Sequence, residues 1–161
     1  MRNISWICLI SCLVLSNIGC VKDKMTAYKA TLHNNSGVRI LILPYKGGFV
    51  SSNDTIRLEN GASMEIANGS EWGEVKIPFF SSQYLAIGQN DSIKIVFDSS
   101  FAVAHFWNTP GNLPSKYHLF NSNRNIINRD SYSFSHNKTK KGYLNEHTYT
   151  FTEDDYNFAR Q

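Results

Sequence analysis

Residues 91–107 read DSIKIVFDSSFAVAHFW and decide the fold class. Ile93, Ile95 and Phe97 alternate with polar neighbours, which is the period of a strand with one buried and one solvent-facing side. The turn-forming residues DSS at 98–100 follow, and residues 102–107 form a second strand-like segment. The stretch therefore predicts two strands that pair with each other.

The same pattern of strand and turn occurs in the N-terminal half. Residues 28–32 alternate, NNSG at 34–37 supplies a turn, and the apolar run VRILIL at 38–43 suits a central strand. Residues 55–59 and 64–66 flank Asn60-Gly61, a strong two-residue turn signal. Two β-hairpins are predicted here, and an irregular stretch is predicted over residues 68–78.

The C-terminal half predicts a third hairpin and a helix. Residues 131–136 and 148–151 alternate around a turn segment at 137–142, and residues 117–120 could form a short strand within a loop over 108–128. Thr152-Glu153-Asp154-Asp155 resembles a capping box with acidic residues in the first turn, so a short helix is expected over 153–159.

Seven or eight short strands with frequent turns and almost no helix predict an all-β fold. The expected architecture is an antiparallel β-sandwich, immunoglobulin-like or related, with a short C-terminal helix. A small β-barrel is the alternative, because alternation alone does not separate the two.

The N-terminus has the pattern of a secretory leader. A positive start at residues 1–3 precedes an apolar run at 4–18, which is shorter than the roughly 20 residues that a spanning helix needs. Gly19-Cys20 then resembles a lipobox, in which the cysteine thiol is acylated and becomes the mature N-terminus. Asn17 stands where that pattern usually has Leu, and Cys12 after Leu9-Ile10-Ser11 is a rival site. We expect a signal peptide at 1–19, a lipidated tether at 20–26 and one domain at 27–161.

Cysteine positions and composition exclude several classes of site. The three cysteines are Cys8, Cys12 and Cys20, so cleavage before Cys20 leaves a domain without free thiols, disulfides or Cys-containing metal sites. The 161 residues are 42% hydrophobic with a formal net charge of +3. These values suit one globular domain, and they indicate no nucleic-acid partner.

No local motif for catalysis or metal binding is present in the sequence. The five histidines show neither H-x-H nor H-E-x-x-H spacing, and no G-x-S-x-G elbow occurs. Capping explains Asp154-Asp155, and the lysines at 138–141 are typical of a solvated hairpin tip. We therefore expect no enzyme, no metal and no cofactor, with the histidines at the surface or in cross-strand pairs.

Aromatic placement is the one suggestive feature for binding. Trp72 and Trp107 both stand among polar and turn residues. They could close the ends of the core, or they could stack on sugar faces if exposed and co-facial. The leading hypothesis is a non-catalytic, membrane-tethered interaction or envelope-structural module. The alternative is a carbohydrate-binding surface lipoprotein that uses the two tryptophans.

Several segments together resemble the small uncharacterised lipoproteins of Bacteroidota. They are Cys20 and its leader, NNSG at 34–37, LENGAS at 58–63, DSIKIVFD at 91–98 and YTFTEDDY at 149–156. The resemblance implies a lipid anchor in the outer membrane, facing the periplasm or the cell surface, because Val21 rather than Asp follows the cysteine. It implies the membrane as a partner through N-terminal acyl chains, with envelope protein or glycan as further partners.

The same resemblance raises a modification hypothesis. O-glycosylation in that lineage follows Asp, then Ser or Thr, then an apolar residue, and this pattern occurs at Thr55 and at Ser92. Both residues also stand at predicted strand starts, where such side chains serve as turn formers.

Overall fold

The computed structural model describes residues 24–75 and 91–161. The described chain is all-β, with two mixed sheets, one α-helix and no closed barrel. Cys8, Cys12 and Cys20, with the whole predicted leader and most of the tether, lie outside the described residues. The expected all-β sandwich class with a C-terminal helix is confirmed, and the barrel alternative is wrong.

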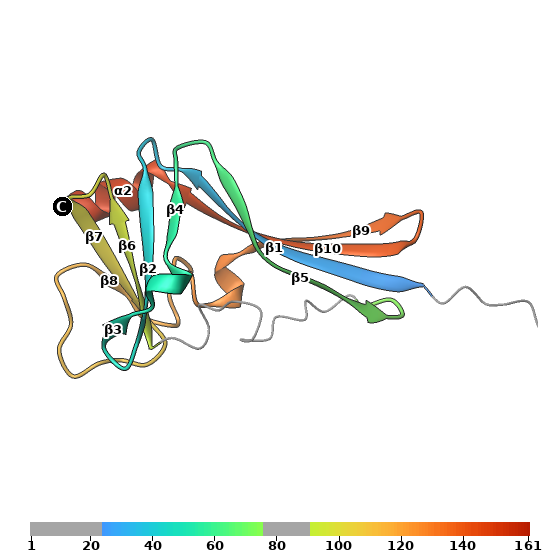
Figure 1. Ribbon diagram of the computed structural model, residues 1–161, viewed down its shortest axis with the longest axis horizontal. Coiled ribbons are helices and arrows are strands. Elements are labelled where there is room, and N and C mark those ends of the chain that lie inside the picture. The colour runs from blue at the N-terminus through green and yellow to red at the C-terminus, as the bar shows by residue number, and fades with distance from the viewer. Residues whose placement is uncertain (1–23, 76–90) are drawn as a thin grey trace, which may run out of the picture.

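Sheet A contains four strands and sheet B contains six (Figure 1). In sheet A the order is β5 (Ser63–Trp72), β1 (Met25–Asn35), β10 (Gly142–Thr152) and β9 (Ser133–Thr139). In sheet B the order is β3 (Phe49–Val50), β2 (Ile40–Lys46), β6 (Ser92–Phe97), β7 (Phe101–Phe106) and β8 (Tyr117–His118), and β4 (Ile56–Leu58) also pairs with β2. Helix α2 (Glu153–Arg160) follows β10 directly.

The two sheets overlap at one end of sheet A only. The strands of sheet B cross the direction of sheet A, and the rest of sheet A projects sideways (Figure 1). We call the projecting part the arm, made of residues 24–30, 67–75 and 133–147, and we call the remaining described residues the body. The molecule is therefore elongated.

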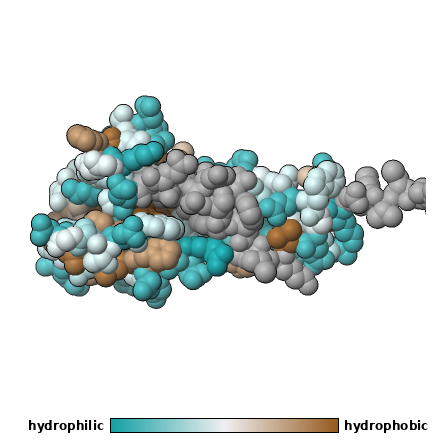
Figure 2. Space-filling view, turned by 90° about the horizontal axis from the view of Figure 1, so that it is seen from below, coloured by the Kyte–Doolittle hydropathy of each residue, from teal (hydrophilic) through white to brown (hydrophobic). Residues whose placement is uncertain are grey.

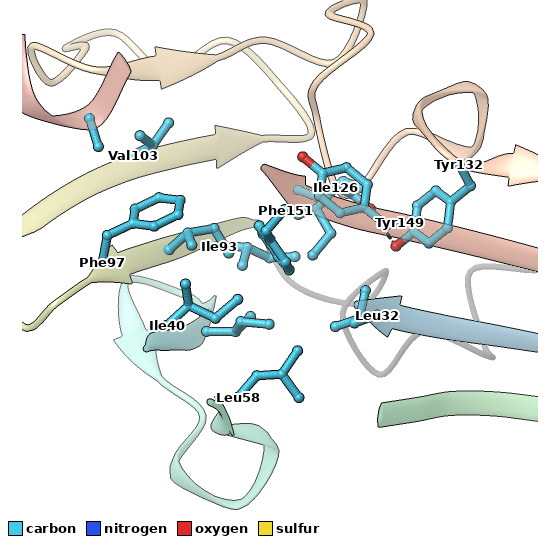
Figure 3. Close-up of a cluster of buried hydrophobic side chains, with 14 residues drawn as sticks. Leu32, Ile40, Leu58, Ile93, Phe97, Val103, Ile126, Tyr132, Tyr149 and Phe151 are labelled. Carbon is cyan, nitrogen blue, oxygen red and sulfur yellow. Dashed lines mark hydrogen bonds between the residues drawn. The ribbon is translucent and has the colours of Figure 1, made fainter. Parts of the chain in front are cut away.

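The hydrophobic core lies in the body, where the two sheets meet α2 (Figure 3). Inward-facing residues of β2, β6 and β7 pack against the body ends of β1 and β10. The cluster comprises Leu32, Ile40, Ile42, Leu58, Ile93, Ile95, Phe97, Val103, Ile126, Ile127, Tyr132, Tyr149, Phe151 and Ala159. All of these residues lie within 32–159, so the core that the structure describes falls in the chain after the predicted tether.

The sheets are mixed, whereas the sequence pattern predicted antiparallel ones. β1 pairs with β10 in parallel along its full length, from Met25 opposite Gly142 to Asn35 opposite Thr152. The reason is topological. The β9–β10 hairpin turns at the end of the arm, so β10 starts where β1 starts and runs the same way into the body. β8 likewise runs parallel to β7.

Both N-terminal hairpins predicted from the sequence are wrong. β1 does not pair with β2 across the turn at 34–37, and β4 does not pair with β5 across Asn60-Gly61. At each turn the chain leaves one sheet and enters the other. Main-chain bonds hold the two corners together, because Asn34 N–H donates to the Ala62 carbonyl at 2.9 Å and Gly61 N–H donates to the Asn34 carbonyl at 2.7 Å.

The Asn34 side chain completes this double corner. It is fully buried, its amide donates to the carbonyls of Val38 (2.8 Å) and Leu58 (3.0 Å), and its oxygen accepts from the Ser36 N–H and hydroxyl. Buried polar groups must find partners, and here one amide satisfies groups from both corners. The turn signals were correct, but they mark sheet-changing corners.

The other predicted elements are confirmed. β6 and β7 pair from Phe97 opposite Phe101, with Asp98 and Ser99 at positive φ in the turn. β9 and β10 form the C-terminal hairpin. α2 begins with the expected capping box, in which the Asp155 carboxylate accepts from the Thr152 N–H at 2.7 Å and from its hydroxyl at 3.1 Å.

Candidate functional site

Trp72 is the last residue of β5 and lies at the end of the arm, opposite Met25. The sequence placed it in a loop, but residues 68–72 continue the strand because they pair with the first residues of β1. Its ring is 71% exposed. Trp72 therefore closes no core, and its apolar surface is free for a ligand or a surface.

Four exposed lysines share the end of the arm with Trp72. Lys138, Lys140 and Lys141 belong to the β9–β10 hairpin, and Lys24 precedes β1. With Met25, Thr139 and Gly142 they line a surface pocket of about 490 Å³. We call Lys24, Lys138, Lys140 and Lys141 the arm-end lysines. The predicted solvated hairpin tip is confirmed, but the parallel β1–β10 pairing adds a fourth lysine to it.

Trp107 occupies a different part of the molecule. It follows β7 in the body, its ring packs on Phe120 with centroids 4.7 Å apart, and 43% of it is exposed. β5 and β7 belong to different sheets and end at opposite parts of the molecule (Figure 1). The structure therefore does not bring Trp72 and Trp107 together on one face.

A second pocket, of about 680 Å³, lies on the outer side of sheet B beside the end of α2. Ala102 and Ala104 give it a small apolar floor, and Phe106 adds an aromatic wall. Lys94 and Lys116 bring positive charge to it. We call it the sheet B pocket, and its lining suits a partly apolar ligand that carries negative charge.

The two modification candidates stand at strand starts, as the sequence predicted. Ser92 begins β6, is half-buried and lines the sheet B pocket. Thr55 directly precedes β4, is half-buried, and its hydroxyl lies 3.4 Å from the Ser51 carbonyl. Neither residue is fully exposed, and the Thr55 hydroxyl contacts the turn that precedes β4.

The largest polar cluster of the body surrounds the loop at 119–131. The His118 and His105 rings lie 5.0 Å apart, and His105 Nδ1 accepts from the Ile126 N–H at 3.2 Å. Arg124 pairs with Asp155 of α2 and donates to the Thr150 carbonyl at 2.9 Å. These contacts hold the loop and the helix on the body, so we assign them a structural role.

Burial sets the charge state of this cluster. The pKa of His105 lies well below its ordinary value, first because the ring is desolvated and then because His118 and Arg124 are nearby. Burial also lowers the pKa of His118. Such rings remain neutral near pH 7.

The histidine prediction is therefore only partly correct. The cross-strand part holds, since His105 lies opposite His118 across β7 and β8 and His147 lies opposite Phe134 across β10 and β9. The surface part fails for His105 and His147, which are buried. Within residues 24–75 and 91–161, no three His, Cys, Asp or Glu side chains are grouped to hold a metal ion.

Sequence reasoning predicted a loop over 108–128 but missed the polar cluster around it, and it also missed the arm as a unit and the sheet B pocket. The lysines at 138–141 were visible, but their distance in sequence from Lys24 and Trp72 hid the shared surface. None of the helices in the described part of the chain is long and apolar enough to cross a bilayer. No protein family, curated protein or solved structure that we compared matches this chain.

Proposed function

We propose that this chain is a lipid-anchored envelope lipoprotein that acts as a non-catalytic interaction module. The observation that carries this proposal is the position of Lys24 and Met25 at the far end of the arm, where the described chain begins. Cys20 precedes Lys24 by only four residues. An acylated Cys20 would hold the arm end at the membrane and the body away from it.

Strand geometry gives the scale of this separation. The 11 residues of β1 span about 35 Å at 3.2–3.4 Å per residue. β1 connects the tethered end to the core, and its pairing with β5 on one side and β10 on the other stiffens it. The arm thus works as a spacer between the membrane and the body. The sheet B pocket lies on the outer side of sheet B, in the body.

We assign the interaction to the sheet B pocket. Its apolar floor with Lys94 and Lys116 favours an amphipathic anionic partner, such as an acidic peptide segment with an aromatic side chain. The polar cluster around His105 and Arg124 is engaged in holding the loop and α2, which supports a non-catalytic role.

Lipidation is tested by intact mass and detergent partitioning after expression in a host that processes lipoproteins. The expected product begins at Cys20, carries the added mass of acyl chains and enters the detergent phase. Cys20→Ala should abolish the acyl mass, and Cys12→Ala is the matched control that should not change it. A soluble, unacylated wild-type product would refute the proposed anchoring.

Partner binding is tested by pull-down from envelope extracts with mature wild-type protein and with the double variant Lys94→Gln/Lys116→Gln. We expect the variant to lose the captured partner. Lys46→Gln/Lys29→Gln removes the same charge outside the pocket and should retain it. Equal capture by both variants would show that the sheet B pocket does not bind the partner.

Carbohydrate binding remains the alternative, in a form that uses one ring. The 71% exposure of Trp72 is the observation that favours it, since a free ring can stack on a sugar. Retardation in gels that contain envelope polysaccharide would reveal it. Trp72→Ala should abolish the retardation, whereas Trp107→Ala should leave it intact.

A further inference from the structure

We propose that the end of the arm is a second membrane contact, in which the arm-end lysines bind anionic lipid headgroups and Trp72 enters the interfacial layer. This inference deepens the proposed function and rests on it, because the anchor delivers the arm end to the bilayer.

The charge at the arm end is positive and local. Four lysines stand there with two carboxylates, Glu71 and Glu74. The Glu74 carboxylate lies 3.7 Å from His136 Nε2, beside the β9–β10 hairpin. In the other described residues nine Lys and Arg stand with ten Asp and Glu. The excess of positive charge is thus confined to the end from which the predicted tether leads.

The arm-end lysines are available for a partner. Each is exposed, and in the described part of the chain no carboxylate lies within ion-pair distance of any of them. Lys29, further along the same sheet, is different because its ammonium contacts Glu146 at 2.7 Å. On the face drawn in Figure 2, the arm end is mostly hydrophilic, while hydrophobic surface gathers over the body.

Trp72 adds the apolar part of the contact. It shares a face of sheet A with Met25, its partner in the β1–β5 ladder. Tryptophan has an apolar ring system with one polar N–H, and it is enriched at the headgroup level of membranes for that reason. An exposed tryptophan at the same end of the arm as four lysines therefore fits a bilayer surface better than it fits bulk water.

The predicted anchor brings this surface within reach of the headgroups. Lys24 is the fourth residue after Cys20, and these four steps along the chain span at most about 14 Å. The arm end therefore stays within the headgroup region and the first layer of water. An acyl anchor combined with a basic patch gives firmer attachment than the anchor alone, and each lysine near an anionic surface contributes roughly a fivefold factor in binding constant.

The experiment uses residues 21–161 without acyl chains, so it does not depend on lipidation, and this chain contains every residue of the described core cluster. Co-sedimentation is measured with vesicles of phosphatidylcholine alone and with vesicles containing about 30% phosphatidylglycerol. We expect binding only to the anionic vesicles, and we expect it to disappear between about 0.1 M and about 0.5 M salt. Binding to neutral vesicles, or binding that persists at high salt, would overturn the proposal.

The variant Lys138→Gln/Lys140→Gln/Lys141→Gln should lower the binding constant about 100-fold. The matched control Arg39→Gln/Lys46→Gln/Arg57→Gln removes the same charge from exposed positions of the body outside the sheet B pocket and should bind within about twofold of wild type. Equal losses in the two variants would reject the arm end as the contact. Circular dichroism of both variants verifies that they are folded, which their exposed positions favour.

Fluorescence reports the depth of the ring. Residues 21–161 contain only Trp72 and Trp107, so Trp107→Phe leaves Trp72 as the single reporter. Its emission should shift to the blue on anionic vesicles and be quenched by brominated lipid.

Dextran sulfate, an anionic polymer, competes with the vesicles for the arm end in a second assay. If the protein binds this polymer more tightly than the vesicles and the ring stays unquenched by brominated lipid, the surface recognises an anionic glycan and the proposal fails. Failure of these tests together with an acylated product would reject the contact while leaving the anchoring intact.

Discussion

At the residue scale, Asn34 is the side chain on which both sheet-changing corners depend. Asn34→Ala removes four side-chain hydrogen bonds in a buried place, which should lower the free energy of unfolding by about 3 kcal/mol. Urea unfolding measures the loss. Asn35→Ala, at the exposed neighbouring position, should change it by less than about 0.5 kcal/mol. Equal losses in the two variants would mean that the buried Asn34 amide does not hold the two corners together.

Gly142 allows β1 and β10 to meet at the arm end. Its φ is +144°, and a Cβ there would run into the Met25 carbonyl oxygen. Gly142→Ala should therefore cost about 2 kcal/mol of stability and loosen the arm end. Gly111→Ala meets no atom within 4 Å and is the control. Thermal unfolding compares them, and an unchanged midpoint in Gly142→Ala would contradict the observed pairing.

His105 makes stability depend on pH. Its folded pKa is lowered, so below a pH of about 6.5 the unfolded chain binds a proton that the folded chain resists. The contribution of His105 to the free energy of unfolding is therefore fully present above about pH 6.5, and it decreases as the pH falls towards the pKa of the folded state. Burial lowers the pKa of His118 and His147 and adds to the same trend.

Urea unfolding at about pH 7.5 and about pH 5 measures this dependence. His105→Gln should reduce the difference in stability between the two conditions. A difference as large as that of wild type would show that other groups produce it. Titration of the His105 ring by NMR then assigns the change directly.

At the scale of elements, the Asp155 carboxylate adds a polar link between α2 and the body to the packing of Tyr156, Phe158 and Ala159. Asp155 completes the capping box and pairs with Arg124, which also bonds the last part of β10. Asp155→Ala should cost about 2 kcal/mol, because it removes a cap and leaves the guanidinium half-buried without its partner. The hydrogen-exchange rates of the α2 amides should be higher in Asp155→Ala than in wild type.

Asp154→Ala is the matched control. Asp154 lies in the same first turn but is exposed, so its loss should cost at most about 0.5 kcal/mol through the helix dipole. Similar losses of stability in the two variants would mean that Asp155 acts only through its charge near the helix N-terminus, and not through the cap and the Arg124 pair.

At the scale of the whole molecule, the division into arm and body should appear as a difference in local stability. The core cluster lies in the body, whereas β9 is a mostly exposed edge strand of the arm. Few buried apolar contacts mean low opening free energies. Amides of β9 should exchange faster than those of β6, which is paired on both sides and buried at alternate residues. Equal protection would mean that arm and body open together.

Local elements were predictable because their causes are local. The alternation of Ile93, Ile95 and Phe97 predicts a half-buried strand wherever that strand pairs, and the capping box at Thr152 acts within one turn of helix. The corners at 34–37 and 58–62 were located correctly for the same reason. Their role was not predictable, since a turn signal says that the chain reverses or bends but not which strand it meets next.

The candidate site was predictable only in fragments. Trp72 and the lysines at 138–141 were visible in the sequence as an exposed aromatic candidate and a solvated turn. Their common location depends on β1, which pairs with β5 on one side and with β10 on the other. The β1–β10 pairing joins residues that are far apart in the sequence, such as Met25 and Gly142, and no local pattern records it.

The sequence by itself determined the strand and helix segments, the absence of cysteine from residues 21–161 and the apolar faces that form the core, because these follow from side-chain chemistry over a few residues. Tertiary structure alone decided that sheet A is mixed and extends beyond the core as an arm, and that its end gathers four lysines and Trp72. The physical reason is that strand pairing is made by backbone hydrogen bonds, which every residue except proline offers alike, so the choice of partner strand falls to the packing of the whole core.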